Sequence, residues 1–194
     1  IDSYQKFTES VPISSYEDLY PYIKRTMCGE MNILWPGKTK WFAKSSGTTN
    51  SDSKYIPITQ DSLYKCHYKG GKDMLSLYAN NFPVKNLYNG KGLMLGGSLK
   101  YNTHNVQEGD LSAILIKNFP FWVNMHRVPD KKTATMSDWE KKLEKIVEQA
   151  IKENITNLTG VPSWMLILLQ RVISKTNKNN ILEVWPNLEL YMHG

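Results

Sequence analysis

The residues best suited to chemistry form one polar cluster between two apolar, strand-like segments. Residues 45–50 read S-S-G-T-T-N, and Lys54 follows a few positions later. Glycine lets a backbone approach a ligand closely, serine and threonine hydroxyls donate hydrogen bonds, and lysine supplies a mobile positive charge. Phosphate oxygens require all three kinds of partner. The same composition also fits a plain surface turn, because Ser/Thr/Gly clusters between strands are common.

Other catalytic patterns are missing from the sequence. The four histidines share no close spacing with each other, and the adjacent Cys66 and His67 have no further cysteine or histidine at zinc-ligand spacing, so there is no zinc signature. The motifs G-x-S-x-G, Walker A and G-x-G-x-x-G are absent as well. Aromatic side chains are plentiful, but they do not interleave with basic ones as in a nucleic-acid platform. Phosphate binding around residues 45–54 is therefore the strongest chemical signal.

Composition limits the partners and the compartment. The chain has 194 residues and a net charge of +6, but its basic residues are scattered, which favours a solvated surface over a nucleic-acid partner. Its two cysteines form no disulfide framework, which indicates a reducing, cytoplasmic setting. The most apolar run, residues 164–169, is too short to span a bilayer, which takes about 20 residues, so no membrane partner is expected.

Strand-like and helix-like segments alternate along the chain, which predicts an α/β fold with mixed sheets flanked by helices. Two capping boxes, at residues 14–17 and 137–140, indicate where helices begin. The helix expected from residue 163 is apolar on nearly all sides, so we expect it to be buried. Strands are predicted at 40–45, 55–59, 92–97 and 188–192, helices at 16–27, 60–78, 139–151 and 163–174, and 109–117 fits either.

Several stretches resemble one enzyme family. The order S-S-G-T-T followed by K-Y-I-P resembles the phosphate-binding loop of the adenylate-forming, luciferase-like enzymes. Over essentially the whole chain, the sequence is more narrowly similar to the acyl-acid amido synthetases of the auxin-responsive promoter family, in its bacterial branch. The stretches that carry this likeness are VPISSYEDLYPYIKR, GLMLGGS, GDLSAIL, DWEKKLEKI, LTGVPSWMLILL and EVWPNLELYMHG.

The resemblance implies a two-step ligase reaction. A small carboxylic acid attacks the α-phosphate of ATP in the presence of Mg²⁺, pyrophosphate leaves, and an amino acid or another amine then takes the acyl group from the acyl-adenylate. Two alternatives stay open: a ligase that passes the acyl group to a thiol such as coenzyme A, and a non-catalytic relative that only binds a small acid or nucleotide.

The resemblance also implies roles for particular residues. Lys54 would be the catalytic residue beside the departing pyrophosphate. The helix start at Val161 and Trp164 would line the acyl pocket, although a Trp/Met stripe at helical spacing is more often core. His193 and Gly194 would lie beside adenine, and the phosphate contacts would come from Ser45, Ser46, Gly47, Thr48 and Thr49.

Two features limit what the chain is expected to do. The family often has glycine where Ser51 stands and a basic residue near Asp52, and a carboxylate there would oppose phosphate binding unless it points outward or acts through a metal. The resemblance further implies that residues 1–194 are part of an N-terminal adenylation domain whose metal-binding carboxylate and C-terminal domain lie outside this chain. The acid, the amine, the oligomeric state and the pathway are not indicated.

Overall fold

The computed structural model describes residues 2–45, 53–83 and 86–193. It is an α/β structure built around two four-stranded sheets, as the alternating pattern predicted. The first, sheet A, has the order β2-β1-β5-β4, in which β1 runs antiparallel to β2 and parallel to β5. Its strands are β1 (Trp41–Lys44), β2 (Tyr55–Ile58), β4 (Leu99–Tyr101) and β5 (Gln107–Gly109).

Sheet B has the order β6-β3-β7-β8, and all of its paired strands run parallel. Parallel strands need crossover connections, which cover both faces with helices, so their residues are buried and apolar. The residues of β3 and β7 follow this rule, since Leu93 and Ile155 are fully buried. The strands are β3 (Lys91–Met94), β6 (Arg127–Val128), β7 (Ile155–Thr159) and β8 (Leu190–Met192).

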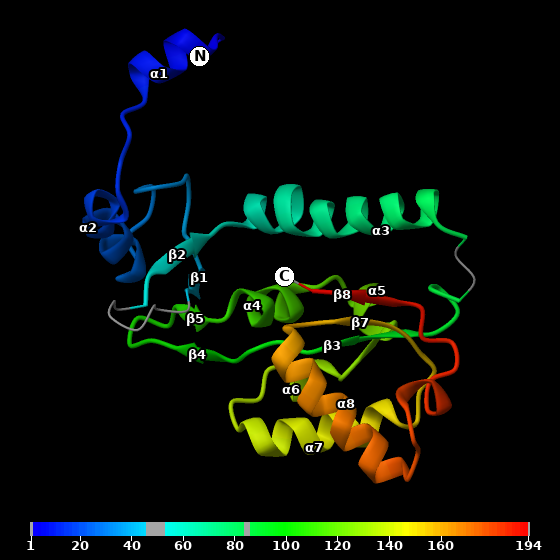
Figure 1. The fold of residues 1–194 in the computed structure, drawn as a ribbon. Helices are drawn as coiled ribbons and strands as arrows, with labels where there is room; N and C mark the ends of the chain where they lie inside the picture. The colour runs from blue at the N-terminus through cyan, green and yellow to red at the C-terminus, as the bar shows by residue number, and fades with distance from the viewer. Residues whose placement is uncertain (1, 46–52, 84–85, 194) are drawn as a thin grey trace.

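Helices cover sheet B from two sides. In Figure 1, α3 (Lys69–Asn81) lies on one side of the sheet, and α7 (Trp139–Ala150) and α8 (Pro162–Thr176) lie on the other. The largest buried cluster joins these two helices to the sheet and includes Leu143, Ile146, Met165 and Leu168. The other helices of the body are α2 (Tyr16–Met27), α4 (Leu111–Asn118), α5 (Phe121–Met125) and α6 (Lys131–Ala134), with a π-helical segment at Ser62–Tyr68 and a 3₁₀ turn at Ile181–Glu183.

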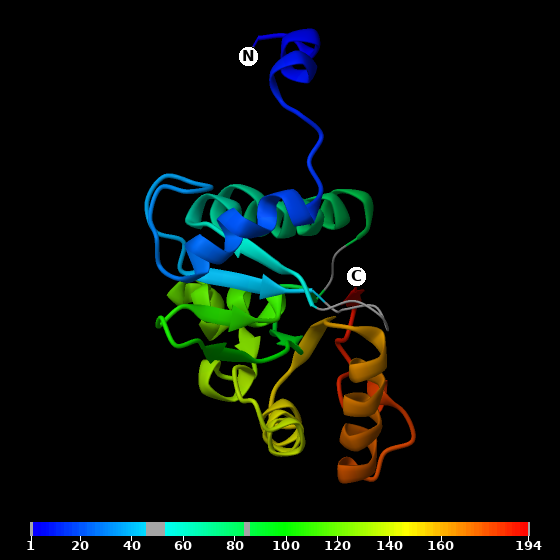
Figure 2. The ribbon, with the colours of Figure 1, turned by 90° about the vertical axis from the view of Figure 1, so that its left-hand side faces the viewer.

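Helix α1 (Tyr4–Ser10) has no buried residue and stands apart from the body of the molecule in both views of the ribbon (Figure 1, Figure 2). An extended segment connects it to α2. No helix in the part of the chain that the structure describes is long and apolar enough to cross a membrane.

The helices begin at Tyr16 and Trp139, as predicted, but the residues that cap them differ from the predicted ones by one position. The hydroxyl of Ser15 accepts a hydrogen bond from the amide of Asp18, and the Asp18 carboxylate accepts one from the amide of Ser15. The N-cap of α7 is Asp138, whose carboxylate accepts a hydrogen bond from the amide of Lys141. Placing the capping boxes at 14–17 and 137–140 was therefore wrong, because the aspartate one position on is as good a partner for the free amides of the first turn as serine or glutamate.

The prediction that the helix at 163–174 is buried was correct on one face only. Met165, Leu168 and Val172 are buried against the sheet, whereas Leu166 and Ile167 are exposed. Periodicity failed here because apolar residues occupy both the core face and the outer face of α8.

The fold predicts that Ile146 is a main source of stability. Its side chain is fully buried between α7 and sheet B, so Ile146→Ala leaves a cavity and is expected to lower the free energy of unfolding by about 2–5 kcal/mol. Lys145→Ala, an exposed neighbour on the same helix, is the matched control and should change it by less than about 0.5 kcal/mol. Urea denaturation of the full-length protein measures both, and equal effects would contradict this assignment of the core.

Candidate functional site

The carboxyl ends of the parallel strands define the candidate site. In open parallel sheets, ligands bind outside the carboxyl ends of the strands. In sheet B these ends are adjacent, since the amide of Leu95 donates to the carbonyl of Thr159 at 2.9 Å and the amide of Gly160 donates to that of Met192 at 3.2 Å. Val161 follows Gly160 directly, so the predicted acyl-pocket residue lies at this edge.

The ends of the predicted phosphate loop are bonded to each other. The amide of Ser45 donates to the carbonyl of Lys54 at 2.9 Å, and the amide of Lys54 donates to the hydroxyl oxygen of Ser45 at 3.0 Å. These bonds extend the β1–β2 pairing and hold the loop at the carboxyl end of β1. Among the residues that the structure describes, the Ser45 hydroxyl acts only as an acceptor, which leaves its own hydrogen for a bond to a phosphate oxygen.

The ammonium of Lys54 is directed toward α2. It lies 3.3 Å from a carboxylate oxygen of Glu17 and 4.8 Å from the ring centre of Tyr16. Tyr16 also accepts a hydrogen bond from the amide of Tyr55 at 2.9 Å, so α2 contacts the exit of the loop twice. The pKa of the Glu17 carboxyl is lowered, first by its own backbone amide and then by Lys54. Both groups of the ion pair are largely exposed, which makes Lys54 free to exchange partners at small cost.

The remaining predicted phosphate contacts, Ser46, Gly47, Thr48 and Thr49, lie outside the described residues, as do Ser51, Asp52 and Gly194. Their predicted roles therefore rest on the sequence alone. Among residues 2–45, 53–83 and 86–193, no three histidine, cysteine, aspartate or glutamate side chains gather closely enough to hold a metal ion.

Trp164 and Val161 have different surroundings. The Trp164 ring packs against that of Trp139 on α7, with ring centres 5.0 Å apart, and is partly buried at the edge of the main core. Val161 is 43% exposed at the N-terminus of α8. His193 is exposed at the end of β8, with its ring 5.3 Å from that of Tyr191. The geometry thus brings Val161 and His193 to the same edge and leaves Trp164 one helical turn behind it.

A buried lysine below this edge was missed by sequence reasoning. Lys142 is only 1% exposed, and its ammonium donates to the carbonyls of Gly96 and Gly97, each at 2.6 Å. These glycines form the turn after β3, where the chain leaves sheet B for β4 of sheet A. The signal that singles out Lys142 is its spacing, three residues after Trp139 and four before Ile146, which places it on the apolar face of α7.

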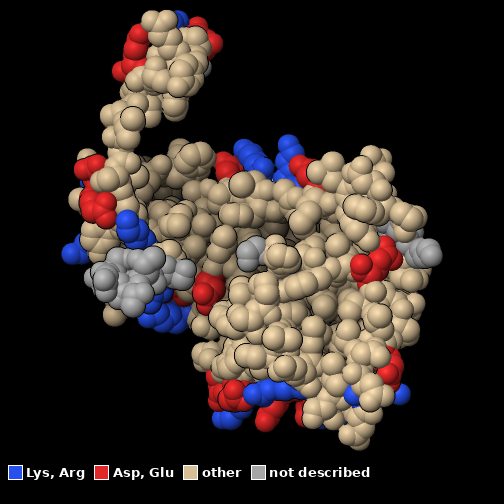
Figure 3. Space-filling model, in the orientation of Figure 1, with Lys and Arg blue, Asp and Glu red and all other residues tan. Residues whose placement is uncertain are grey.

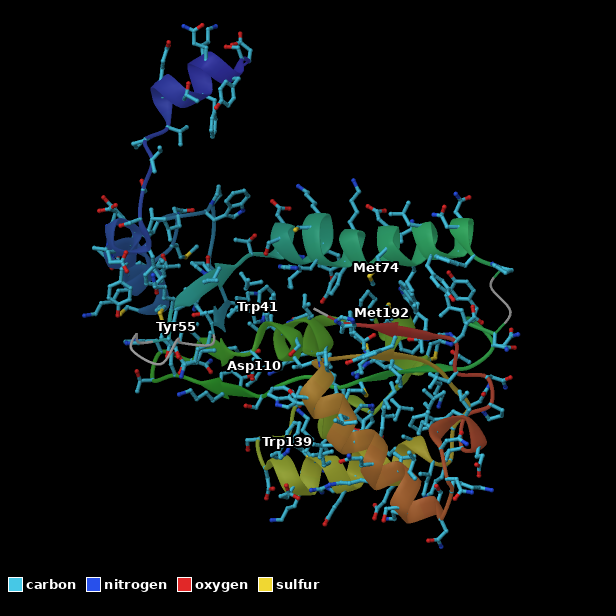
Figure 4. All side chains as sticks on the ribbon, viewed as in Figure 1. Trp41, Tyr55, Met74, Asp110, Trp139 and Met192 are labelled. Carbon is cyan, nitrogen blue, oxygen red and sulfur yellow. The ribbon has the colours of Figure 1, made fainter. Side chains whose placement is uncertain are left out.

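The same turn is bonded from its other side by α4. The amide of Gly97 donates to the Ser112 hydroxyl at 3.1 Å, and the amide of Ser98 donates to a carboxylate oxygen of Asp110 at 2.9 Å. Figure 4 labels Asp110, which follows β5 directly. A Cβ atom on Gly97 would lie 1.9 Å from the Asp110 carboxylate, so only glycine fits there. Side chains from two helices therefore satisfy the backbone of this buried turn.

The electrostatics of Lys142 follow from this position. Burial lowers the pKa of its ammonium to about 8, and the negative charge of Asp110 partly opposes that shift. A protonated lysine is retained at neutral pH because two carbonyl oxygens and a nearby carboxylate replace part of its lost hydration.

The surface around the edge has little charge. In Figure 3 the middle of the viewed face, between α3 and the rest of the body, is largely free of charged side chains, which gather at its margins. Met74 on α3 and Met192 on β8 point toward one another across this region in Figure 4. Uncharged walls beside a polar loop would suit a ligand with an apolar body and an anionic end.

Two solved structures of acyl acid amido synthetases share this fold. The chain matches the GH3.15 acyl acid amido synthetase with a TM-score of 0.64, at 20% identity, over 89% of this chain and 31% of that one. A structure of AtGH3.15 acyl acid amido synthetase in complex with 2,4-DB matches with a TM-score of 0.68, at the same identity and coverage. At this identity the likeness establishes the fold: the chain has the α/β fold of part of an acyl acid amido synthetase.

Residues 1–194 match the GH3 family N-terminal domain, and the chain belongs to that family. A putative indole-3-acetic acid-amido synthetase of Oryza sativa subsp. japonica is 36% identical over 91 residues, which are 45% of this chain and 18% of that protein. A jasmonoyl-L-amino acid synthetase of Nicotiana attenuata is 30% identical over 106 residues, which are 51% of this chain and 18% of that protein. The chain thus spans about a fifth of the length of these relatives, and the predicted family is confirmed.

The ammonium of Lys142 is predicted to lose its proton at a much lower pH than that of an ordinary lysine. In ¹³C spectra of protein labelled at lysine Cε, the signal of Lys142 is the one that disappears in the variant Lys142→Arg. In the wild type, this signal should titrate with a midpoint near pH 8. Asp110→Asn should lower that midpoint, because it removes the charge that favours the ammonium. Since the folded pKa lies below the unfolded value of 10.5, burial of the charge costs stability below about pH 8, and this cost is relieved as the pH rises toward 10.5. A midpoint above pH 10 would contradict the burial of this group.

Proposed function

We propose that the full-length protein containing this chain is an ATP-dependent ligase that activates a carboxylic acid as its acyl-adenylate and transfers the acyl group to an amino acid or another amine. The chain would be part of the N-terminal adenylation domain, with the C-terminal domain outside it. Membership of the GH3 family supports this proposal, as do relatives named as indole-3-acetic acid-amido and jasmonoyl-amino acid synthetases. The observation that carries it is the loop whose ends, Ser45 and Lys54, are bonded together at the carboxyl end of β1.

In the proposed first step, an oxygen of the carboxylate attacks the α-phosphorus of ATP and the bond to the β-phosphate breaks, which releases pyrophosphate. Negative charge grows on the leaving group, so hydroxyl and ammonium donors held in place beforehand stabilise the transition state. Ser45 has a hydroxyl hydrogen available for this purpose, and Lys54 lies at the other end of the same loop. In the second step the amine attacks the acyl carbon, loses a proton, and AMP leaves.

Mg²⁺ would enter as the complex with ATP, where it neutralises part of the phosphate charge. We assign no residue of this chain to the metal. The acid would bind near Val161, with its apolar part toward the uncharged surface at the edge of sheet B. A cytoplasmic location is also proposed, on the basis of the free cysteines Cys28 and Cys66. The bacterial branch stays a prediction, since the relatives described above are plant proteins.

A non-catalytic binding protein is the second candidate. Two features favour it. Glu17 forms an ion pair with the ammonium of Lys54, the predicted catalytic group, and Ser51 and Asp52 stand where the family often has a glycine and a basic residue. Transfer to coenzyme A instead of an amine is the third candidate, and the acceptor supplied in the second step of an assay distinguishes it from the first.

ATP–pyrophosphate exchange, driven by a panel of aryl and alkyl acids, tests the proposal in the full-length protein. Lys54→Ala is expected to lower exchange by about 10²-fold or more, because it removes a donor to the departing pyrophosphate. Glu17→Gln is expected to act in the opposite direction and lower the KM for ATP by at most about fivefold, since it frees Lys54 from an exposed ion pair.

Lys132→Ala is the control for these variants, because Lys132 is an exposed lysine on α6. Equal rates of exchange in Lys54→Ala and in the wild type would rule out a catalytic role for this lysine. No exchange with any acid, from a folded protein, would favour the non-catalytic binding protein.

Substitutions of Val161 and Trp164 should have different effects, one on acid binding and the other on stability. Val161→Ala is expected to change the KM for the acid and leave the unfolding midpoint within about 1 °C, because Val161 is exposed at the edge. Trp164→Ala is expected to lower the free energy of unfolding by about 2–4 kcal/mol through loss of packing on Trp139. If Trp164→Ala changed only the KM for the acid, the tryptophan would be a pocket residue and not part of the core.

A further inference from the structure

We propose that Lys142 is a positioning residue for the adenylation step: by holding the Leu95–Ser98 turn, it sets the distance between the bound acid and the bound nucleotide. This inference rests on the proposed function. It concerns a side chain that belongs to neither the phosphate loop nor the acyl pocket and that does not touch either substrate.

The turn is buried and depends on side chains for its hydrogen bonds. Gly96 and Gly97 are both buried, and their carbonyls accept from Lys142, whereas the amides of Gly97 and Ser98 donate to α4. Backbone groups that are buried without a partner are costly, so this turn has one favoured position as long as its side-chain partners are present.

On the acid side, the turn contacts the residues that precede the proposed acyl pocket. The amide of Leu95 donates to the carbonyl of Thr159, and a Cβ atom on Gly160 would lie 3.0 Å from the carbonyl oxygen of Leu95. Gly160 has a φ of +158° and has no room to move toward the turn. A displacement of Leu95 therefore moves Gly160 and, with it, Val161.

On the nucleotide side, the turn is bonded to the strand beside the phosphate loop. Asp110 accepts from the amide of Ser98, and the amide of Asp110 donates to the carbonyl of Ser98 at 3.1 Å. Asp110 follows Gly109, which is the register partner of Ala43 on β1, two residues before Ser45. The Leu95–Ser98 turn thus lies between the two binding sides and is bonded to both.

Among the described residues of α7, Lys142 is the one whose side chain hydrogen-bonds to this turn. Its ammonium offers three donors, two of which hold successive carbonyls at 2.6 Å. Because a misplacement of about 1 Å between reacting groups can lower a rate by about 10²-fold, loosening the turn affects the rate of reaction more than the binding of either substrate.

The test is ATP–pyrophosphate exchange by the full-length protein, with kcat and both KM values measured for Lys142→Met. Methionine has a similar length but donates no hydrogen bond, and removal of a buried charge offsets part of the loss of the two bonds. The expected result is a fall in kcat of about 10-fold or more, with each KM changed less than about threefold and the unfolding midpoint nearly unchanged. Lys142→Arg, which keeps the donors, should recover part of kcat.

Lys145→Met is the matched control, because it makes the same replacement on an exposed position of α7 and should leave kcat unchanged. Ser112→Ala loosens the turn from α4 and removes one oxygen atom only. It should lower kcat by about threefold or more at an unchanged unfolding midpoint. If Lys142→Met fails to fold, this variant tests whether the turn controls the rate.

The outcomes separate this inference from the proposed function. A wild-type kcat in folded Lys142→Met, or in Ser112→Ala if the former is unfolded, overturns the positioning role while the ligase assignment stands. A change confined to one KM overturns it as well, since the lysine would then support one binding site only. No exchange by the wild type with any acid refutes the proposed function, and this inference fails with it.

Discussion

The structure depends on how the chain crosses between its two sheets. The turn after β3 leaves a fully parallel sheet and enters one of mixed direction. Within the part of the chain that the structure describes, no strand pairs with the backbone of Gly96 and Gly97 at its centre. A buried ammonium, a carboxylate and a hydroxyl, from α7, the N-cap of α4 and α4 itself, replace that pairing. Burial of a charge is expensive, so such an arrangement is better explained by the need for one defined geometry than by a gain in stability.

Much of the fold follows from local pattern, because strands and helices with one buried face reveal their periodicity. The loop between β1 and β2 and the amphipathic helix α7 were predicted on that basis. The helix α8 was predicted, but the face that packs on the sheet was not. Apolar residues such as Leu166 also lie on its outer face, so the sequence does not distinguish the two sides. The helix starts at Tyr16 and Trp139 were predicted, but the capping residues were placed one position too early. Asp18 takes the place expected for Glu17, and Asp138 the place expected for Ser137, because these side chains are equally good acceptors for the free amides.

The candidate site could be read from sequence only where residues that act together are close in the chain. Ser45 and Lys54 belong to one short loop, so their types and spacing could be read together, and the phosphate partner that they suggest stays a prediction. Lys142 lies 45 and 46 residues from the carbonyls it binds, and on a helix with several other lysines its type carries no information. Long-range partners of this kind become visible only when tertiary packing has brought α7 against the turn.

The bonded ends of the predicted phosphate loop have a consequence for how this family can change over evolutionary time. Since Ser45 and Lys54 hold each other through two hydrogen bonds, the pairing of β1 with β2 does not depend on the residues between them. Loop closure depends only weakly on loop length, so substitutions or small insertions there need not shift the register of either strand. The intervening residues are thus free to adapt to different ligands while the scaffold that presents them is inherited unaltered.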